Sequence, residues 1–214
     1  MIIGLCGAQG SGKDTVANIL VAKYGFVCIS FAAALKDVIA ILFSWPRDML
    51  EGDTPESRAW RLAPDAEWSL KTGIPGFTPR KALQMVGTDL IRHHIYINLW
   101  IDIVEKQIAM ILAANPKAKI VVSDCRFTNE VAAVKKFPGA RLVRIVRPDC
   151  EPLSSRSHLS SRSHLSSRSH LSETVDLSES VDITLVNNST IEALEEMWLS
   201  TINSASSVCH NPGK

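Results

Sequence analysis

The sequence lacks the features that mark several classes of protein. Among the 214 residues there is no apolar run of the roughly 18 residues that span a bilayer, and the start, MIIGLCGAQG, has no signal-peptide pattern. The net charge of +1 gives no basic field that would attract nucleic acid. The five cysteines form no C-x-x-C pair, which argues against a zinc site and favours reduced, mostly buried thiols. We therefore expect a cytoplasmic protein that binds neither membrane nor nucleic acid.

The composition that is present is typical of one α/β domain, with 46% hydrophobic and 21% charged residues. Short apolar runs predict buried strands at 2–6, 26–30, 119–123, 141–146 and 181–186. Helical patterns lie between them, at 12–24, 32–43 (largely buried), 78–92, 97–114, 128–137 and 190–203. This alternation predicts an α/β fold of three α/β/α layers around a parallel sheet of about five strands.

Changes in composition along the chain divide it further. We expect a single domain over residues 1–203 and a loose tail at 204–214. Within the domain, residues 44–118 begin irregularly and continue with helical patterns, and residues 148–180 contain a serine-rich stretch. The tryptophans of 44–70 would form an interface if they lay on the surface, which keeps a homodimer open.

The first motif follows the first predicted strand and opens the next helix. It reads G-A-Q-G-S-G-K over residues 7–13, the G-x-x-x-x-G-K phosphate-binding loop in its required context. Glycines let the loop turn its backbone N–H groups inward toward phosphate oxygens, and Lys13 neutralises charge on the transferred phosphoryl group. The residues assigned to nucleotide binding are Gly7, Gly10, Ser11, Gly12, Lys13, Asp14 and Thr15.

One position departs from the general motif. Asp14 stands where a serine or threonine usually supplies a hydroxyl to magnesium, and Thr15 follows it. Either residue fits a magnesium site, and Asp14 also suits a helix N-terminus through its charge alone. The sequence does not decide between these roles.

A second motif, Ser123-Asp124-Cys125-Arg126, ends the strand predicted at 119–123. An acid at the C-terminal end of such a strand lies where magnesium or the attacking group is organised, so Asp124 is a catalytic and metal-binding candidate. Arg126 has the forked guanidinium that binds phosphate, although a solvated arginine is the alternative.

A third motif is the helical pattern TPRKALQMVGTDLIR over 78–92. With α-helical spacing, its polar residues share one face suited to an anionic, hydrogen-bonding ligand such as a nucleoside monophosphate, or else a solvated face. The candidates are Arg80, Gln84, Thr88, Asp89 and Arg92. Gly87 costs the helix about 1 kcal/mol relative to alanine, which indicates either a close approach or a break.

Taken together, these stretches resemble the phage-type deoxynucleoside monophosphate kinases of the phosphate-loop nucleoside monophosphate kinase group. The resemblance rests on GAQGSGKDT (7–15), FAAALKD (31–37), LQMVGTDLI (83–91) with Trp100, DCRFTNE (124–130), VRIVRP (143–148), SHLSE (169–173) and DITLVNNSTIEAL (182–194). The lysine-aspartate-threonine variant of the loop, combined with G-T-D and D-x-R, is much more specific than the loop alone.

The resemblance implies transfer of the γ-phosphoryl group of ATP to a deoxynucleoside 5′-monophosphate with magnesium, so its partners are small-molecule nucleotides. The magnesium candidates are Asp14, Thr15 and Asp124, and Lys36 joins the acceptor site as a ligand of the monophosphate. The resemblance also implies that 44–118 is a helical substrate-binding region and that 148–180 is a lid, which would contribute Arg168. Two alternatives remain: a phosphate-loop kinase of another small acceptor, of the dephospho-coenzyme A or phosphomevalonate type, and a nucleotide-binding switch or ATPase module.

The lid region contains three successive copies of SSRSHL over residues 154–171. One copy runs into the stretch that resembles the family, which makes 154–165 a 12-residue tandem duplication. Lengthening a loop in this way costs only about 0.5 kcal/mol in closure entropy, so we expect a chain without it to fold and to stay active. Zinc binding by the three histidines and an arginine-serine segment for nucleic acid or phosphorylation are the alternatives.

Overall fold

The computed structural model describes residues 1–148 and 177–207, and the side chains of the latter segment as far as Ser200. The chain separates into two compact units, one formed by 1–28 with 115–214 and the other by 29–114. Each unit is described by itself below. No helix in the described part of the chain is both long enough and apolar enough to cross a bilayer.

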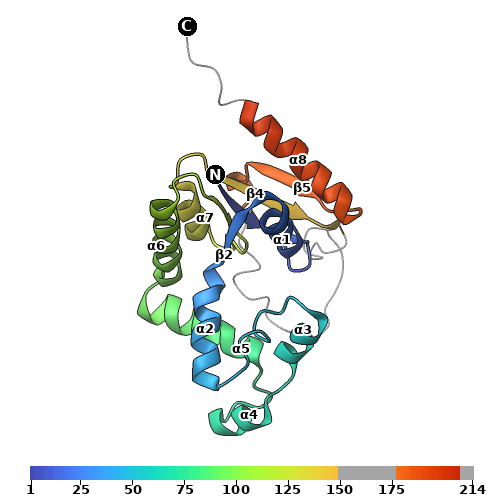
Figure 1. The fold of residues 1–214 in the computed structure, drawn as a ribbon. Coiled ribbons are helices and arrows are strands. Elements are labelled where there is room, and N and C mark those ends of the chain that lie inside the picture. Colours follow the sequence, from blue (N-terminus) through green and yellow to red (C-terminus); the bar gives the residue numbers. More distant parts are fainter. Residues whose placement is uncertain (149–176, 208–214) are drawn as a thin grey trace, which may run out of the picture. The chain divides into compact units, whose positions relative to one another are not determined.

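The first unit is built on a sheet. In the described residues five strands lie in the order β2-β3-β1-β4-β5 (Figure 1). The strands are β1 (Ile2–Cys6), β2 (Phe26–Ile29), β3 (Lys119–Val122), β4 (Arg141–Val146) and β5 (Ile183–Val186). The pairs β1–β3, β1–β4 and β4–β5 are parallel. The predicted α/β fold with a five-stranded parallel sheet is therefore confirmed.

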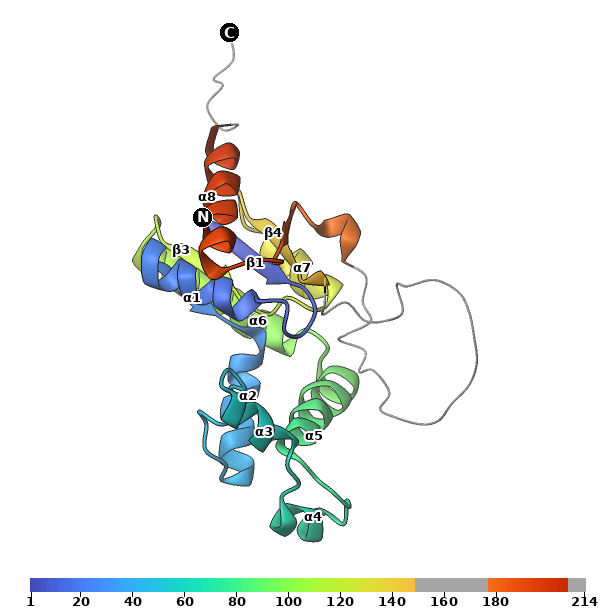
Figure 2. The ribbon, with the colours of Figure 1, turned by 90° about the vertical axis from the view of Figure 1, so that its right-hand side faces the viewer.

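Helices cover both faces of this sheet. The helices of this unit are α1 (Lys13–Tyr24), α7 (Thr128–Lys135) and α8 (Ile191–Ser207), with a short 3₁₀ helix, η5 (Ser178–Ser180). Helices α1 and α8 lie along one side of the sheet (Figure 2), and Leu20 of α1 and Leu194 of α8 share one core cluster with Leu5 and Ile145 of the sheet. On the opposite face Gly4 of β1 packs against Val134 of α7. Because side chains alternate between the faces of a strand, both faces of β1 are buried.

The second unit is helical. Its helices are α2 (Phe31–Phe43), α3 (Pro55–Leu62), α4 (Ala66–Thr72), α5 (Pro79–Gln84), the π-helix η1 (Met85–Ile95) and α6 (Leu99–Ala114). Side chains cap four of their N-termini, at Ser30, Thr54, Asp65 and Thr78, where a hydroxyl or carboxylate oxygen accepts from a backbone N–H in the first turn. Most of the predicted helices are confirmed within two residues, but α8 continues to Ser207, through residues that we had assigned to the tail.

Two expectations for this unit do not hold in full. Of the tryptophans in 44–70, Trp45 is buried, and Trp60 and Trp68 are partly buried against the same core cluster. Stacking of Trp45 on Phe43, with 4.5 Å between ring centroids, gives the irregular segment its own apolar core. The helix α2 is not largely buried either, since Ile41 is 79% exposed and neighbouring helices cover only part of its surface.

Candidate functional site

The phosphate-binding loop has the backbone that its glycines allow. Gly7, Gly10 and Gly12 have φ values of 140°, 79° and 103°, in a region that other residues rarely adopt. A Cβ at Gly7 would also collide with the carbonyl oxygen of Ile145 in β4. The loop between β1 and α1 therefore depends on glycine both for its turn and for its close packing against the sheet.

Lys13 lies folded over this loop. Its Nζ donates to the carbonyl oxygens of Gly7 at 2.8 Å and Ala8 at 2.7 Å. Burial lowers the pKa of Lys13 below its ordinary value, the positive charge of Arg126 lowers it further, and Asp14 acts in the opposite direction. The ammonium group is thus held at the loop by weak neutral acceptors, which an anion can replace.

Asn187, which follows β5, fixes the loop from the far end of the chain and was missed in the sequence. Its Nδ2 donates to the carbonyl oxygen of Ser11 at 2.9 Å, and its own backbone N–H donates to Val146 at 2.7 Å. A Cβ at Gly12 would come within 2.5 Å of that amide nitrogen. In the sequence, the stretch VNNST supports only the family resemblance, because a single asparagine is not a recognisable motif.

Ser11, one of the residues assigned to nucleotide binding, is a buried part of the loop. Its side chain is fully buried, with 0% of the residue exposed, and its backbone N–H donates to Ala8 at 3.2 Å. Any contact of Ser11 with a phosphate would therefore come through the backbone.

The second motif lies beside the loop because its strand is the neighbour of β1. The register pairs Gly4 with Val122, and the backbone N–H of Cys125 donates to the carbonyl oxygen of Leu5 at 3.0 Å. Asp124 and Arg126 flank this anchored residue, and both act electrostatically on Lys13. The parallel strands therefore bring together Lys13, Asp124 and Arg126, the catalytic candidates that lie in the described part of the first unit.

Glu130 secures the turn that carries these residues. It is 2% exposed, and its Oε2 accepts from the backbone N–H groups of Arg126 at 2.8 Å and Phe127 at 3.1 Å. The carboxylate accepts from two backbone donors at the start of α7, so it positions the turn after β3.

The residues present fit a magnesium ion bound together with nucleotide phosphates. Asp14 is exposed in the first turn of α1, Thr15 is partly exposed, and Asp124 is partly exposed after β3. Both carboxylates act on the charge of Lys13, which places them around the same loop. In the described residues no three His, Cys, Asp or Glu side chains form a metal cluster, but magnesium in kinases needs only one or two protein ligands besides phosphate and water.

The acceptor candidates all lie in the second unit. Lys36 of α2 forms an ion pair with Glu51, with 2.5 Å between Nζ and Oε2. Arg80, Gln84 and Arg92 are partly exposed and Asp89 is exposed, whereas Thr88 is buried. The prediction that these residues share one polar face is therefore wrong for Thr88, which is buried.

The change of helix type explains this difference. The α-helix α5 ends at Gln84, and the chain continues as the π-helix η1, whose last turn shows an i to i+5 bond from Tyr96 N to Ile91 O at 2.8 Å. Residues four apart no longer stack beyond Gln84, so α-helical spacing does not predict which side chains share a face.

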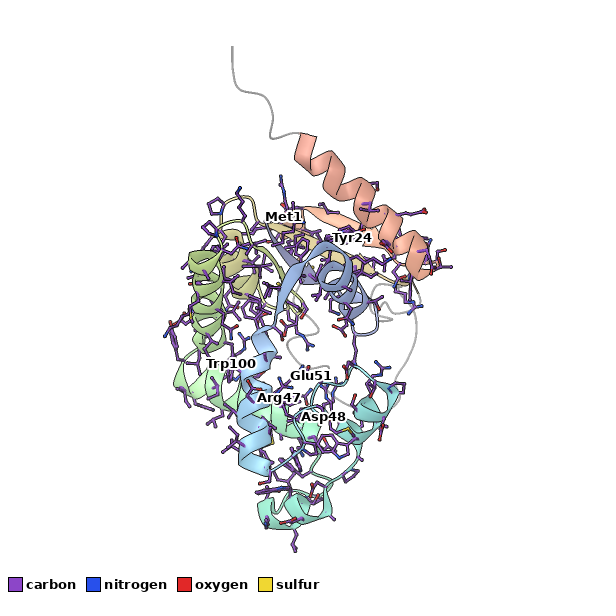
Figure 3. All side chains as sticks on the ribbon, in the orientation of Figure 1. Met1, Tyr24, Arg47, Asp48, Glu51 and Trp100 are labelled. Carbon is purple, nitrogen blue, oxygen red and sulfur yellow. The ribbon has the colours of Figure 1, made fainter. Side chains whose placement is uncertain are left out.

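Gly87 marks a close approach, one of the two roles that the sequence left open. A Cβ there would collide with Cδ2 of Leu35 in α2. The Nε1 of Trp100, which is labelled in Figure 3, donates to the carbonyl oxygen of Gly87 at 3.0 Å. Through Leu35, Gly87 and Trp100, helices α2, η1 and α6 are in direct contact. Leu35 immediately precedes Lys36 in α2.

The lid residues lie outside the described part of the chain. This applies to Arg168, to the repeat region 154–171 and to most of the segment 148–180 assigned to the lid.

The sheet, the loop after its central strand and the lysine folded over that loop define the class of protein, a phosphate-loop α/β protein. The sequence model of the deoxynucleotide monophosphate kinase family matches residues 71–197. A protein of Acanthamoeba polyphaga mimivirus, provisionally named deoxynucleotide monophosphate kinase, is 33% identical over 213 residues, which cover 96% of this chain and 98% of that protein. The chain belongs to the deoxynucleotide monophosphate kinase family, as the resemblance predicted, and is a phosphotransferase.

Solved structures with similar folds are more distant. TT1252 from Thermus thermophilus is 19% identical with a TM-score of 0.48, covering 95% of this chain and 97% of that one. A sugar kinase from Janibacter sp. HTCC2649 is 16% identical with a TM-score of 0.46, covering 98% of both chains.

Proposed function

We propose that this chain transfers the γ-phosphoryl group of ATP to a deoxynucleoside 5′-monophosphate, producing ADP and the diphosphate. Family membership supports the acceptor class. The single observation that carries the site is the convergence of Lys13, Asp124 and Arg126 beside the glycine loop. Phosphoryl transfer is mainly a problem of alignment and charge neutralisation, and this arrangement supplies both.

On the ATP side, the backbone N–H groups of the loop and the N-terminus of α1 bind the β- and γ-phosphates. Lys13 exchanges its two carbonyl partners for phosphate oxygens, which satisfy a buried ammonium better because the hydrogen bonds become charge-assisted. Arg126 binds the transferred group through its fork. Magnesium, when bound, shields the phosphate charge and is held by Asp124 with Asp14 or Thr15.

On the acceptor side, Lys36 binds the 5′-phosphate and Gln84 reads a base edge. Arg80, Arg92 and Asp89 line the same substrate region, and the buried Thr88 supports the helix that carries them. We further propose a cytoplasmic setting, that of the host cell if the chain is viral, because the buried cysteines Cys6 and Cys125 are free thiols.

A panel of the four deoxynucleoside monophosphates with ATP and magnesium tests this function. Product chromatography should show ADP and one or more deoxynucleoside diphosphates in equal amounts. Dephospho-coenzyme A and phosphomevalonate serve as rival acceptors in the same assay. Acceptor-independent ATP hydrolysis, or transfer to a rival acceptor alone, would contradict the proposal.

A further inference from the structure

A charged cluster in the second unit surrounds one carboxylate with two cations. The Oε2 of Glu51 accepts from Lys36 Nζ at 2.5 Å, and its Oε1 accepts from Nη1 of Arg47. Arg47 Nε donates in turn to Asp37 Oδ1 at 2.5 Å. Arg47 and Glu51 lie side by side in the segment that follows α2 (Figure 3). Each carboxylate oxygen therefore has its own cation, the arrangement that a phosphate group would require.

The two cations are less exposed than the carboxylate. The Lys36 side chain is 14% exposed and that of Arg47 is 33% exposed, compared with 41% for Glu51. The buried residues Trp45 and Leu50 anchor the segment on either side of Arg47. The lysine and arginine are thus preorganised, and the glutamate side chain is more open to water than either of them.

The charge balance indicates what could replace the carboxylate. With Glu51 in place, the charges of Lys36 and Arg47 are cancelled by those of Glu51 and Asp37. If the Glu51 side chain turns outward, a single positive charge remains, with an ammonium and a guanidinium fork facing the vacated position. A phosphate monoester carries two negative charges and offers more acceptor oxygens than a carboxylate, so it fits this position better.

We infer that Lys36 and Arg47 together bind the 5′-phosphate of the acceptor, and that Glu51 occupies this position until the acceptor displaces it. The inference rests on the proposed function and adds Arg47 to its site. Glu51 then acts as an internal competitor, which keeps two cations satisfied in the empty site and sets the affinity for the acceptor.

Calorimetric titration with the preferred deoxynucleoside monophosphate, without ATP, tests this assignment. Glu51→Gln keeps the shape of the side chain but removes its charge, so the dissociation constant should fall by about 3- to 10-fold. Arg47→Ala should raise it by about 10- to 100-fold, because a charge-assisted contact is lost. Glu67→Gln, which breaks the exposed ion pair with Lys71 in the same unit, is the matched control and should change nothing.

A double variant separates a binding role of Arg47 from a structural one. If Arg47 only holds Glu51 in place, Arg47→Ala has no effect on binding in a Glu51→Gln background. If it binds phosphate, the loss remains about 10-fold or more. The inference is overturned if Glu51→Gln leaves acceptor affinity unchanged or weakens it, or if the Arg47 effect disappears in the double variant.

A second probe keeps this test independent of the proposed reaction. Inorganic phosphate is titrated against Lys13→Ala protein, in which the loop site is weakened, with and without Glu51→Gln. Tighter phosphate binding in the double variant supports the clamp even if no deoxynucleoside monophosphate proves to be a substrate. Equal binding by the two proteins contradicts it, whatever the acceptor assay shows.

Discussion

Asn187 donates its side-chain amide to the carbonyl oxygen of Ser11 across 176 residues of sequence, and this bond ties the end of β5 to the phosphate loop. Gly12 makes room for the amide, because a Cβ there would collide with it. The loop is therefore positioned by the last strand of the sheet as well as by its own glycines.

Asn187→Ala should weaken ATP binding. The variant leaves the buried carbonyl oxygen of Ser11 without its side-chain donor, a loss of about 1–3 kcal/mol, so the KM for ATP should rise by about 10-fold. Steady-state kinetics with varied ATP measure this effect, while the KM for the acceptor should stay constant. Asn188→Ala, at the exposed neighbouring amide, is the matched control. Equal ATP kinetics for the Asn187 variant and the wild type would show that the bond does not position the loop.

Gly87→Ala should destabilise the second unit through Leu35. The added methyl group forces Leu35 to move, at a cost of about 1–3 kcal/mol that exceeds the gain of about 1 kcal/mol in helix propensity. In a Leu35→Ala background the same methyl group finds space, so Gly87→Ala should become neutral or stabilising. Urea unfolding of the four proteins measures this change of sign. The same destabilisation in both backgrounds would rule out the contact as its cause.

The ion pairs of Glu51 should stabilise the fold in a pH-dependent way. Burial alone would raise its pKa, but hydrogen bonds and charges from Lys36 and Arg47 outweigh that effect and hold the pKa below the ordinary value of 4.5. A carboxyl with a lower pKa in the folded state contributes stability above pH 4.5, and this contribution disappears as the pH falls through the folded pKa. The difference in melting temperature between wild type and Glu51→Gln should therefore be present at neutral pH and vanish in acid. A difference that persists unchanged in acid would contradict this account.

The sequence predicts the parts of the site that depend on local spacing. The loop 7–13 and the acid after 119–123 are read directly, because each motif sits at the end of a predicted strand and parallel strands align those ends. The class of fold follows from the same alternation of strands and helices. The helical pattern of 32–43 also predicts that Lys36 lies on a helix, but nothing in the sequence predicts its ion pair with Glu51.

The remainder depends on contacts between distant residues. Asn187 reaches Ser11 only in the folded sheet, and the turn that brings Arg47 beside Glu51 has no sequence signature. The tryptophans near residues 44–70 were misplaced because an irregular segment gives no periodicity that separates core from surface. The π-helix at 85–95 likewise changes which residues share a face without any marker in composition.

The most direct test of the proposed site compares Lys13→Ala with wild type in transfer from ATP to a deoxynucleoside monophosphate. Lysine neutralises charge that develops during transfer, so turnover should fall by at least about 10²- to 10³-fold. The melting temperature should stay close to that of the wild type. Lys23→Ala removes a lysine from the same helix, where its side chain is 58% exposed, and should leave the rate unchanged. A folded Lys13→Ala protein that keeps most of its turnover would contradict the assignment of the phosphate loop as the catalytic site.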